Sequence, residues 1–227
     1  MAKGNARRSG SPHRRRDEVI RAGGTVLIAT KNRGKTKEFR KAFEPIGVTV
    51  TDLNETDGIP PIEETGVTFA ENAMLKAREV ARLTGIPVLA DDSGLCVDAL
   101  GGAPGVYSAR YAGEGAGDKA NNAKLLSELG AGTAQTDAEP SGEPRTLSAA
   151  RFVCSLALYD PATDTAVTSE GTVEGLILAE PRGEAGFGYD PLFWVPGFGR
   201  SMAELTPEEK NAISHRGNAL KLLLEKL

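Results

Sequence analysis

Residue types that mark particular protein classes are scarce in this chain. It has two cysteines and two histidines among 227 residues. Cys96 and Cys154 are far apart, and both lie in apolar runs. This spacing fits neither a disulfide framework nor a zinc site, so we expect two small buried thiols.

Long apolar runs are also missing. No segment has the length needed to span a membrane, and the N-terminal stretch lacks the apolar centre of a secretory signal. We therefore expect a cytoplasmic protein with reduced cysteines and no membrane partner.

Positive charge is in short supply over the molecule as a whole. The formal net charge is −4, which does not complement nucleic acid. The basic residues gather instead in the first 23 positions, where only Asp17 and Glu18 oppose them. We predict a basic, disordered tail over residues 1–23 and one domain over residues 24–227. An arm that binds nucleic acid is the less favoured alternative, and no stable nucleic-acid partner is expected.

The remaining pattern mixes short apolar runs with helical periodicity, which is typical of an α/β fold. Strands are expected at Thr25–Thr30, Val48–Leu53, Val88–Ala90, Phe152–Tyr159, Ala166–Leu178 and Leu192–Val195. Helices are expected at Thr36–Phe43, Thr68–Arg82, Lys119–Leu129 and Leu220–Leu227, with one more starting at Thr206. A short turn joins the two longest strands, so we expect them to be neighbours in a mixed sheet. Residues 130–146 are polar and rich in glycine, which predicts a mobile loop or insertion.

Two adjacent carboxylates follow the run at Val88–Ala90. Asp91 and Asp92 precede Ser93 and Gly94, so we expect the acids at the end of a strand. Ligands of α/β proteins gather at such edges, and Mg²⁺ is commonly held by one or two carboxylates plus substrate phosphates. An ordinary Asp-Asp-Ser-Gly turn is the alternative.

A basic loop lies between the first strand and the first helix. Free backbone N–H groups at a helix start attract phosphate, and the lysines and arginine here add charge. The Walker spacing is absent, and a merely exposed basic turn is the alternative. The residues of this candidate phosphate loop are Thr30, Lys31, Asn32, Arg33, Gly34 and Lys35.

A second acidic pair, Glu63 and Glu64, precedes the helix predicted at Thr68–Arg82. One of these acids could join Asp92 around Mg²⁺, or both could simply favour the helix dipole. Asn72 and Lys76 lie one turn apart on that helix and could face the same cleft. A solvated helix face is the other interpretation of that pair.

Two further segments carry ligand-binding chemistry. In the Gly186–Pro191 segment, Phe187 or Tyr189 could stack on a base, while Gly188 allows close approach and Asp190 could read a base edge. Near the C-terminus, Lys210 could meet phosphate, and His215 and Arg216 could donate to a ligand carbonyl. The alternative is a turn packed on the core for the first segment, and a helix junction with a solvent-facing basic pair for the second. A Ser93–His215–Asp triad is disfavoured because Ser93 lacks a nucleophile-elbow context.

Taken together, these segments resemble the inosine triphosphate pyrophosphatase family, the Ham1-like XTP/dITP diphosphatases. The resemblance runs from about Thr25 to Leu227. Five motifs carry it in the same order: TKNRGKTKEF, EETGVTFAENAMLKA, ADDSGLCVDALGGAPGVYSARYAG, GFGYDPLF and AELTPEEKNAISHRG.

The resemblance implies an elongated mixed α/β fold with two lobes around a nucleotide cleft, usually as a homodimer. It implies Mg²⁺-dependent hydrolysis of non-standard purine nucleoside triphosphates (ITP, dITP, XTP) to the monophosphate and pyrophosphate. Asp92 matches the proton acceptor and metal ligand, and we place the second metal carboxylate at Glu64, with Glu63 as the alternative. The matching substrate contacts are Thr30–Lys35, Ser93, Phe187–Asp190, Lys210, His215 and Arg216.

Two features depart from the family pattern. Lys31 stands where members often have a small residue, and the 130–146 segment is longer than usual. Two rival functions remain at this point: a nucleotide- or nucleic-acid-binding module without catalysis, and a Maf-type pyrophosphatase acting on modified pyrimidines. The SHR and GFGYDP segments argue against the Maf type.

Overall fold

A computed structural model describes residues 20, 22–130 and 144–227. Most of the predicted basic tail and residues 131–143 of the predicted loop lie outside this range. Within the tail's last residues, Ile20 packs against a core cluster and the Gly23 N–H donates to the Gly47 carbonyl at 2.8 Å. Contacts with the domain therefore begin ahead of residue 24.

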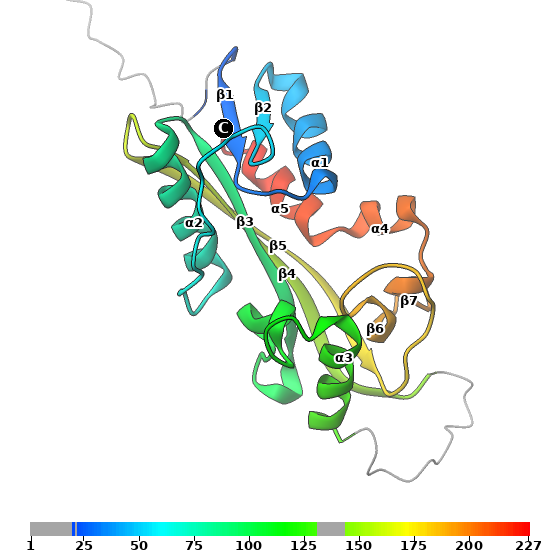
Figure 1. Ribbon diagram of the computed structural model, residues 1–227. Coiled ribbons are helices and arrows are strands. Elements are labelled where there is room, and N and C mark those ends of the chain that lie inside the picture. Colours follow the sequence, from blue (N-terminus) through cyan, green and yellow to red (C-terminus); the bar gives the residue numbers. More distant parts are fainter. Residues whose placement is uncertain (1–19, 21, 131–143) are drawn as a thin grey trace, which may run out of the picture.

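A seven-stranded mixed sheet forms the centre of the molecule, in the order β2-β1-β3-β4-β5-β6-β7 (Figure 1). β1 pairs in parallel with β2 and β3, and all later pairs are antiparallel. This confirms the predicted mixed α/β sheet. The strands are β1 Thr25–Ile28, β2 Thr49–Asp52, β3 Val88–Val97, β4 Thr146–Asp160, β5 Thr165–Leu178, β6 Phe193–Val195 and β7 Arg200–Ser201.

The expectation that β3 ends at Ala90 is wrong. The strand continues through Asp91, Asp92, Ser93 and Gly94 to Val97, and every residue of it pairs with β4. The fifteen-residue β4 supplies partners along the whole length, which outweighs the local turn preference of Asp and Gly. The two carboxylates thus lie in the middle of a long strand instead of at its end.

The helices lie near the predicted positions, and two of them start about a turn earlier: α1 begins at Arg33, ahead of the predicted Thr36, and α5 is the second. α5 starts at His215, ahead of the predicted Leu220, because Ser214 caps it by accepting from the Gly217 N–H. Thr68 and Thr206 each form the capping box that their sequences predict. The helices are α1 Arg33–Phe43, α2 Phe69–Thr84, α3 Gly117–Glu128, α4 Pro207–Ile213 and α5 His215–Leu224.

The long strands β3, β4 and β5 carry a core on both faces. Near β1, one face packs under α1 and α5 around Phe39, Leu89 and Leu156, and the opposite face packs under α2 around Ala77 and Ala90. Farther along, the first face continues into a third cluster, which includes Leu125 of α3 and Phe193 of β6. These clusters form the two lobes of an elongated molecule (Figure 1).

Gly171 on β5 lets α5 approach the sheet closely. A Cβ there would collide with the backbone of His215 and Ala219. The glycine therefore fixes where the start of α5 lies, and with it the positions of His215 and Arg216.

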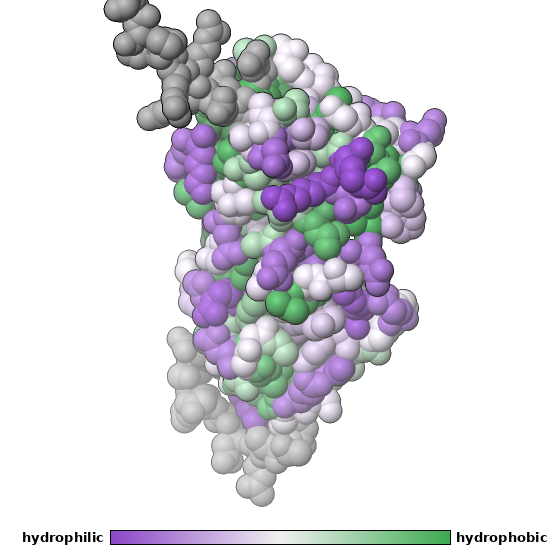
Figure 2. Space-filling model, turned by 90° about the vertical axis from the view of Figure 1, so that its left-hand side faces the viewer, coloured by the Kyte–Doolittle hydropathy of each residue, from purple (hydrophilic) through white to green (hydrophobic). Residues whose placement is uncertain are grey.

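The surface viewed from the α2 side is mixed. Hydrophilic residues predominate there, and the hydrophobic areas are small and scattered (Figure 2). Across the described part of the chain, no helix has the length and hydropathy needed to span a membrane.

Candidate functional site

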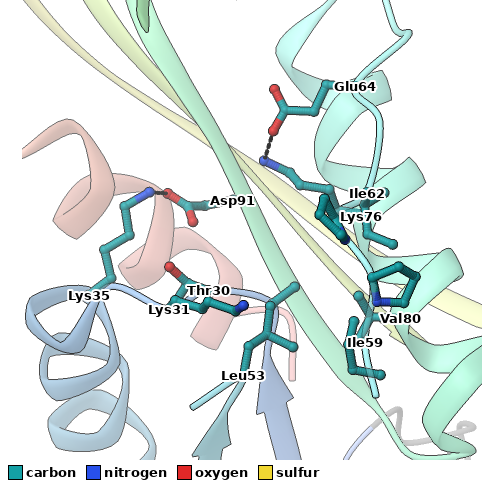
Figure 3. Close-up of a pocket in the computed structure, with 13 residues that line it drawn as sticks. Thr30, Lys31, Lys35, Leu53, Ile59, Ile62, Glu64, Lys76, Val80 and Asp91 are labelled. Atoms are coloured by element: carbon teal, nitrogen blue, oxygen red, sulfur yellow. Dashed lines mark hydrogen bonds and ion pairs between the residues drawn. The ribbon is translucent and has the colours of Figure 1, made fainter. Parts of the chain in front are cut away.

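The site lies where β3 extends beyond the end of its neighbour β1. β1 ends at Ile28, which pairs with Leu89, whereas β3 continues past Asp91 and Asp92. At this edge lies a pocket of about 350 Å³. Its lining includes Thr30, Lys35 and Asp91 on one side and Glu64 and Lys76 on the other, with β3 between them (Figure 3). Lys31 also lines the pocket.

The two adjacent carboxylates point to opposite faces of the sheet, as the period of a strand requires. Asp91 shares its face with α1 and α5. Its Oδ2 lies 2.7 Å from the Lys35 ammonium and 3.4 Å from the Arg216 Nε. Burial alone would raise the pKa of Asp91, but the charges of Lys35 and Arg216 outweigh that effect and hold it at about 2. Asp91 is thus a buried anion that gathers two cations.

Arg216 is part of this cluster on the Asp91 face. Besides Asp91, its guanidinium contacts Glu38 of α1 at 3.4 Å, and its side chain is only 13% exposed. The prediction placed it beside a ligand carbonyl. Instead, its contacts join α5 to α1 and β3, on the side of the phosphate loop.

Asp92 lies on the α2 face, under the residues that the sequence paired with it. Asn72 Nδ2 donates to Asp92 Oδ2 at 3.0 Å, and the Ser93 N–H donates to Oδ1 at 2.9 Å. The Lys76 ammonium is 3.9 Å from Oδ1. Burial raises the pKa of Asp92 in spite of Lys76 and Asn72, which lower it. A carboxylate with a raised pKa is a better proton acceptor.

Asn72 is bonded to the protein at both ends of its amide, because its Oδ1 also accepts from the Gly66 N–H at 2.7 Å. It is therefore placed to hold Asp92 and the 63–66 loop. Ser93, by strand alternation, faces the Asp91 side, where it is paired with Cys154 of β4. Burial raises the pKa of the Cys154 thiol to about 11, so this thiol stays protonated, as expected of a buried cysteine.

Lys76 links the two carboxylates proposed as metal ligands. Its ammonium lies 2.8 Å from Glu64 Oε1 and 3.9 Å from Asp92 Oδ1, whereas Glu63 is exposed. Two carboxylates that converge on one cation form an oxygen donor set of the kind that Mg²⁺ uses. Among the described residues, no three Asp, Glu, His or Cys side chains gather into a larger cluster. Mg²⁺ at this pair would therefore need oxygens from a ligand or water.

The phosphate loop differs from the prediction in one respect. Asn32 caps α1, and its Oδ1 accepts from the Gly34 and Lys35 N–H groups at 2.9 and 3.2 Å. Two donors expected to be free for phosphate are thus already bonded. Lys31 and Arg33 are exposed, so the charge of this loop is available even though these N–H groups are not.

The 186–190 segment presents one aromatic ring and buries the other. Tyr189 packs in the core, and its hydroxyl donates to the Ser108 carbonyl at 2.9 Å. Phe187 is 77% exposed. Of the two rings predicted to stack on a base, only Phe187 is therefore accessible, and the Tyr189 ring instead anchors the loop.

Asp190 is also committed to the protein. Its Oδ2 accepts from the Phe187 N–H at 3.3 Å and pairs with the Lys210 ammonium at 3.1 Å. Gly186, at a φ of +95°, lies against this pair, and a Cβ there would collide with the Asp190 carboxylate. Lys210, predicted to meet phosphate, is thus joined to the 186–190 loop by an ion pair.

His215 is packed rather than exposed. Its ring stacks on Phe152 with centroids 5.4 Å apart and an interplanar angle of 18°. Burial, followed by the charge of Arg216, lowers its pKa to about 4. At neutral pH the imidazole is uncharged, so it can donate one hydrogen bond as a neutral group.

The sequence analysis missed several residues that hold the site. Glu38 contacts Arg216, and Ser108 joins β3 to Tyr189. Asp118 and Asn122 of α3 both bond to Gly188. The spacing of Asp118 and Asn122, one helical turn apart, was the only signal available for them.

Comparison with known proteins is consistent with this arrangement. A model of the Ham1 family matches residues 26–226. A dITP/XTP pyrophosphatase of Geobacillus kaustophilus is 53% identical over 200 residues, covering 88% of this chain and 92% of that protein. The dITP/XTP pyrophosphatase of Bacillus subtilis is 52% identical over 198 residues, covering 87% and 94%.

Solved structures give the same result. A Ham1 protein from Coxiella burnetii superposes with a TM-score of 0.78 at 42% identity, covering 89% of this chain and 99% of that one. The Staphylococcus aureus Ham1 protein gives 0.77, also at 42% identity, covering 89% and 97%. With the family model spanning nearly the whole described domain and these relatives matching almost end to end, this chain belongs to the Ham1 family.

Proposed function

We propose that this protein hydrolyses non-standard purine nucleoside triphosphates (ITP, dITP and XTP) to the nucleoside monophosphate and pyrophosphate. One observation carries the proposal: a buried carboxylate, Asp92, is held by Asn72 beside the Lys76–Glu64 pair. This arrangement occurs in a chain about half identical to proteins named dITP/XTP pyrophosphatases. We further propose that it acts in the cytoplasm, as a homodimer.

Asp92 is the proposed general base. Each of its oxygens accepts one protein hydrogen bond, which fixes the carboxylate and leaves lone pairs for a water molecule. In the reaction this water attacks the α-phosphorus and passes a proton to Asp92, while the bond to the bridging oxygen breaks and pyrophosphate leaves. General-base catalysis of this kind contributes roughly 10²–10⁴-fold.

The cations of the site would stabilise the negative charge of the triphosphate. Lys35 and Arg216 gather on Asp91, Lys31 lines the same pocket, and Lys76 enters from α2. Charge that develops on the leaving pyrophosphate is stabilised most by groups already in place. Thr30, Asn32, Arg33 and Gly34 complete the proposed contact with the phosphates.

Glu64 and Asp92 are the proposed ligands of Mg²⁺, which when bound would neutralise charge on the phosphates. Their shared contact with the Lys76 ammonium supports this assignment, because the ammonium occupies the place of a cation between two carboxylates. The magnesium requirement is to be tested directly, with the metal omitted and then restored.

Base choice is assigned to the other end of the site. Phe187 would stack on the purine, with Gly188, Tyr189 and Asp190 shaping the loop that holds it. His215 or Arg216 is the proposed donor to the 6-oxo group, which adenine replaces with an amino group. A site that donates at this position leaves its donors unpaired against ATP, a mismatch that can reject an analogue by about 10⁴-fold.

The proposal is tested by release of pyrophosphate over a panel of ITP, dITP, XTP, GTP, ATP and a modified pyrimidine triphosphate, with and without Mg²⁺. The expected result is fast release from the first three substrates only, with one monophosphate formed per pyrophosphate. Preference for the pyrimidine would favour the Maf type, and nucleotide binding without turnover would favour a binding module.

The position of attack is tested in ¹⁸O-labelled water. Attack on the α-phosphorus places the label in the nucleoside monophosphate. Label in the pyrophosphate would contradict the role given to Asp92, because attack would then occur at the β-phosphorus.

A further inference from the structure

One helix outside the predicted site holds the loop that carries Phe187. α3 presents Asp118 and Asn122, one turn apart. Asp118 Oδ2 accepts from the Gly188 N–H at 2.7 Å, and Asn122 Nδ2 donates to the Gly188 carbonyl at 3.0 Å. Both polar groups of one backbone residue are thus bonded to the same face of one helix.

The orientation of Asn122 is set by this contact. Its Oδ1 is buried and has no hydrogen-bond partner in the described part of the chain. The reversed amide would place that oxygen against the Gly188 carbonyl oxygen, where the two would repel. Buried polar atoms in native proteins are rarely left unpaired. The Asn122 amide leaves its oxygen unpaired in order to donate to Gly188, so the bond to Gly188 determines its orientation.

α3 is itself fixed, so the clamp has a firm base. Asn121 accepts from the Ala112 N–H at 2.8 Å and donates to the Ala109 carbonyl at 3.2 Å, and Leu125 packs in the core. The next two residues of the loop are held as well, Tyr189 through its hydroxyl and Asp190 through its carboxylate. The Phe187 ring is therefore exposed, while each of the three residues that follow it is held by a hydrogen bond or an ion pair.

We propose that Asp118 and Asn122 are positioning residues that hold Phe187 in place as a stacking platform for the substrate base. This inference rests on the proposed function, because it assumes a nucleotide with its base against Phe187. A ring held in advance loses less conformational freedom on binding. The clamp should therefore lower the KM for the nucleotide and leave the reacting atoms unaffected.

The test compares steady-state kinetics on ITP with inhibition by inorganic triphosphate, which has no base. Asp118→Ala should raise the KM for ITP about fivefold, and Asn122→Ala about threefold, as expected for one lost hydrogen bond. The kcat should stay within about twofold, and the inhibition constant of inorganic triphosphate should not change. Asp118→Asn keeps an acceptor for the Gly188 N–H and should restore most of the affinity.

Two comparisons separate positioning from general damage. In a Phe187→Ala background, Asp118→Ala should have no further effect on KM, because residues that act through one another are not additive. Ser127→Ala, at an exposed position on the same helix, is the matched control and should behave as wild type. If Asp118→Ala does not fold, Asn122→Ala answers the same question, measured alone and in the Phe187→Ala background.

Three results would overturn the inference: an unchanged KM in both clamp variants, equal effects with and without Phe187, or weaker inhibition by inorganic triphosphate that parallels the KM. Failure of the proposed function looks different, because then the wild-type protein itself would release no pyrophosphate from ITP.

Discussion

The two ends of the candidate site are organised in opposite ways. At the phosphate end, the charged groups are paired with one another: Lys35 and Arg216 with Asp91, and Lys76 with Glu64 and Asp92. At the proposed base end, the group proposed to bind the purine is an uncharged, exposed ring, Phe187, on an anchored loop.

This difference means that the two ends bind a ligand at different cost. A triphosphate must compete with Asp91 and Glu64 for the lysines and the arginine, so part of its attraction replaces existing ion pairs. A purine that stacks on Phe187 displaces only solvent. The phosphate end is therefore suited to holding charges in a fixed arrangement for catalysis, and the base end is suited to adding affinity and selectivity.

The largest expected effect separates the two adjacent carboxylates. Asp92→Asn should lower kcat at least about a hundredfold while the protein still binds nucleotide, because the variant keeps its shape but loses the proton acceptor. Pyrophosphate release and equilibrium binding of ITP are the two measurements. Turnover near the wild-type level would remove Asp92 from the mechanism.

The neighbouring Asp91→Asn should act mainly on stability. Removing this anion leaves Lys35 and Arg216 beside a neutral amide, and breaking a buried pair costs about 3 kcal/mol. Denaturant unfolding measures this loss, and kcat should fall far less than in Asp92→Asn. If kcat instead falls as far as in Asp92→Asn, the assignment of catalysis to Asp92 and of stability to Asp91 is wrong.

Asp91 also predicts that the free energy of unfolding falls at acid pH. The pKa of Asp91 lies at about 2 in the folded protein against an ordinary value of 3.8. The stabilisation that the ionised Asp91 adds to the free energy of unfolding is present above pH 3.8. It is lost as the pH falls towards 2, because the unfolded chain binds the proton more readily than the folded protein does. Asp91→Asn should lack this part of the pH dependence.

Much of the fold, and the segments that build the site, could be predicted because short-range signals carried them. The caps at Thr68 and Thr206 and the short turn between β4 and β5 are local features that tertiary packing did not override. The contacts at the site could not be predicted in the same way. β3 runs through Asp91–Gly94 because β4 pairs with it, and a partner more than fifty residues away leaves no mark on the local turn propensity.

The same limit applies to the contacts of Arg216 within the protein. Its charge and its fixed separation from His215 suggested a donor to a ligand carbonyl. Its actual position follows from the close approach of α5 to Gly171, which sets Arg216 over Asp91. Asp118 and Asn122 were missed for a similar reason, since their partner is the backbone of a residue about seventy positions later.

Arg216 provides a direct test of which end it serves. If it donates to the 6-oxo group, Arg216→Ala should reduce the ratio of kcat/KM for ITP over ATP by about one to two decades, the value of a hydrogen bond to a charged donor. Its contacts with Asp91 and Glu38 favour the phosphate end, for which both substrates fall together and the ratio stays constant. Glu38→Gln is the companion variant and should give a weaker form of the same result.

The smallest expected effect concerns His215. Its pKa is about 4 in the folded protein against an ordinary 6.5, chiefly because the ring is buried. Between these values the unfolded chain takes up a proton that the folded protein does not, so stability rises with pH across this window and the full contribution is present above pH 6.5. From pH 7 to pH 5 the change in the free energy of unfolding is on the order of 2 kcal/mol.

His215→Gln should flatten the dependence of the unfolding free energy on pH in this range, and Lys221→Ala, at an exposed position on the same helix, should not. An equal slope in His215→Gln and wild type would mean that the imidazole is hydrated in solution, and it would then be free to act as a charged donor at the base end.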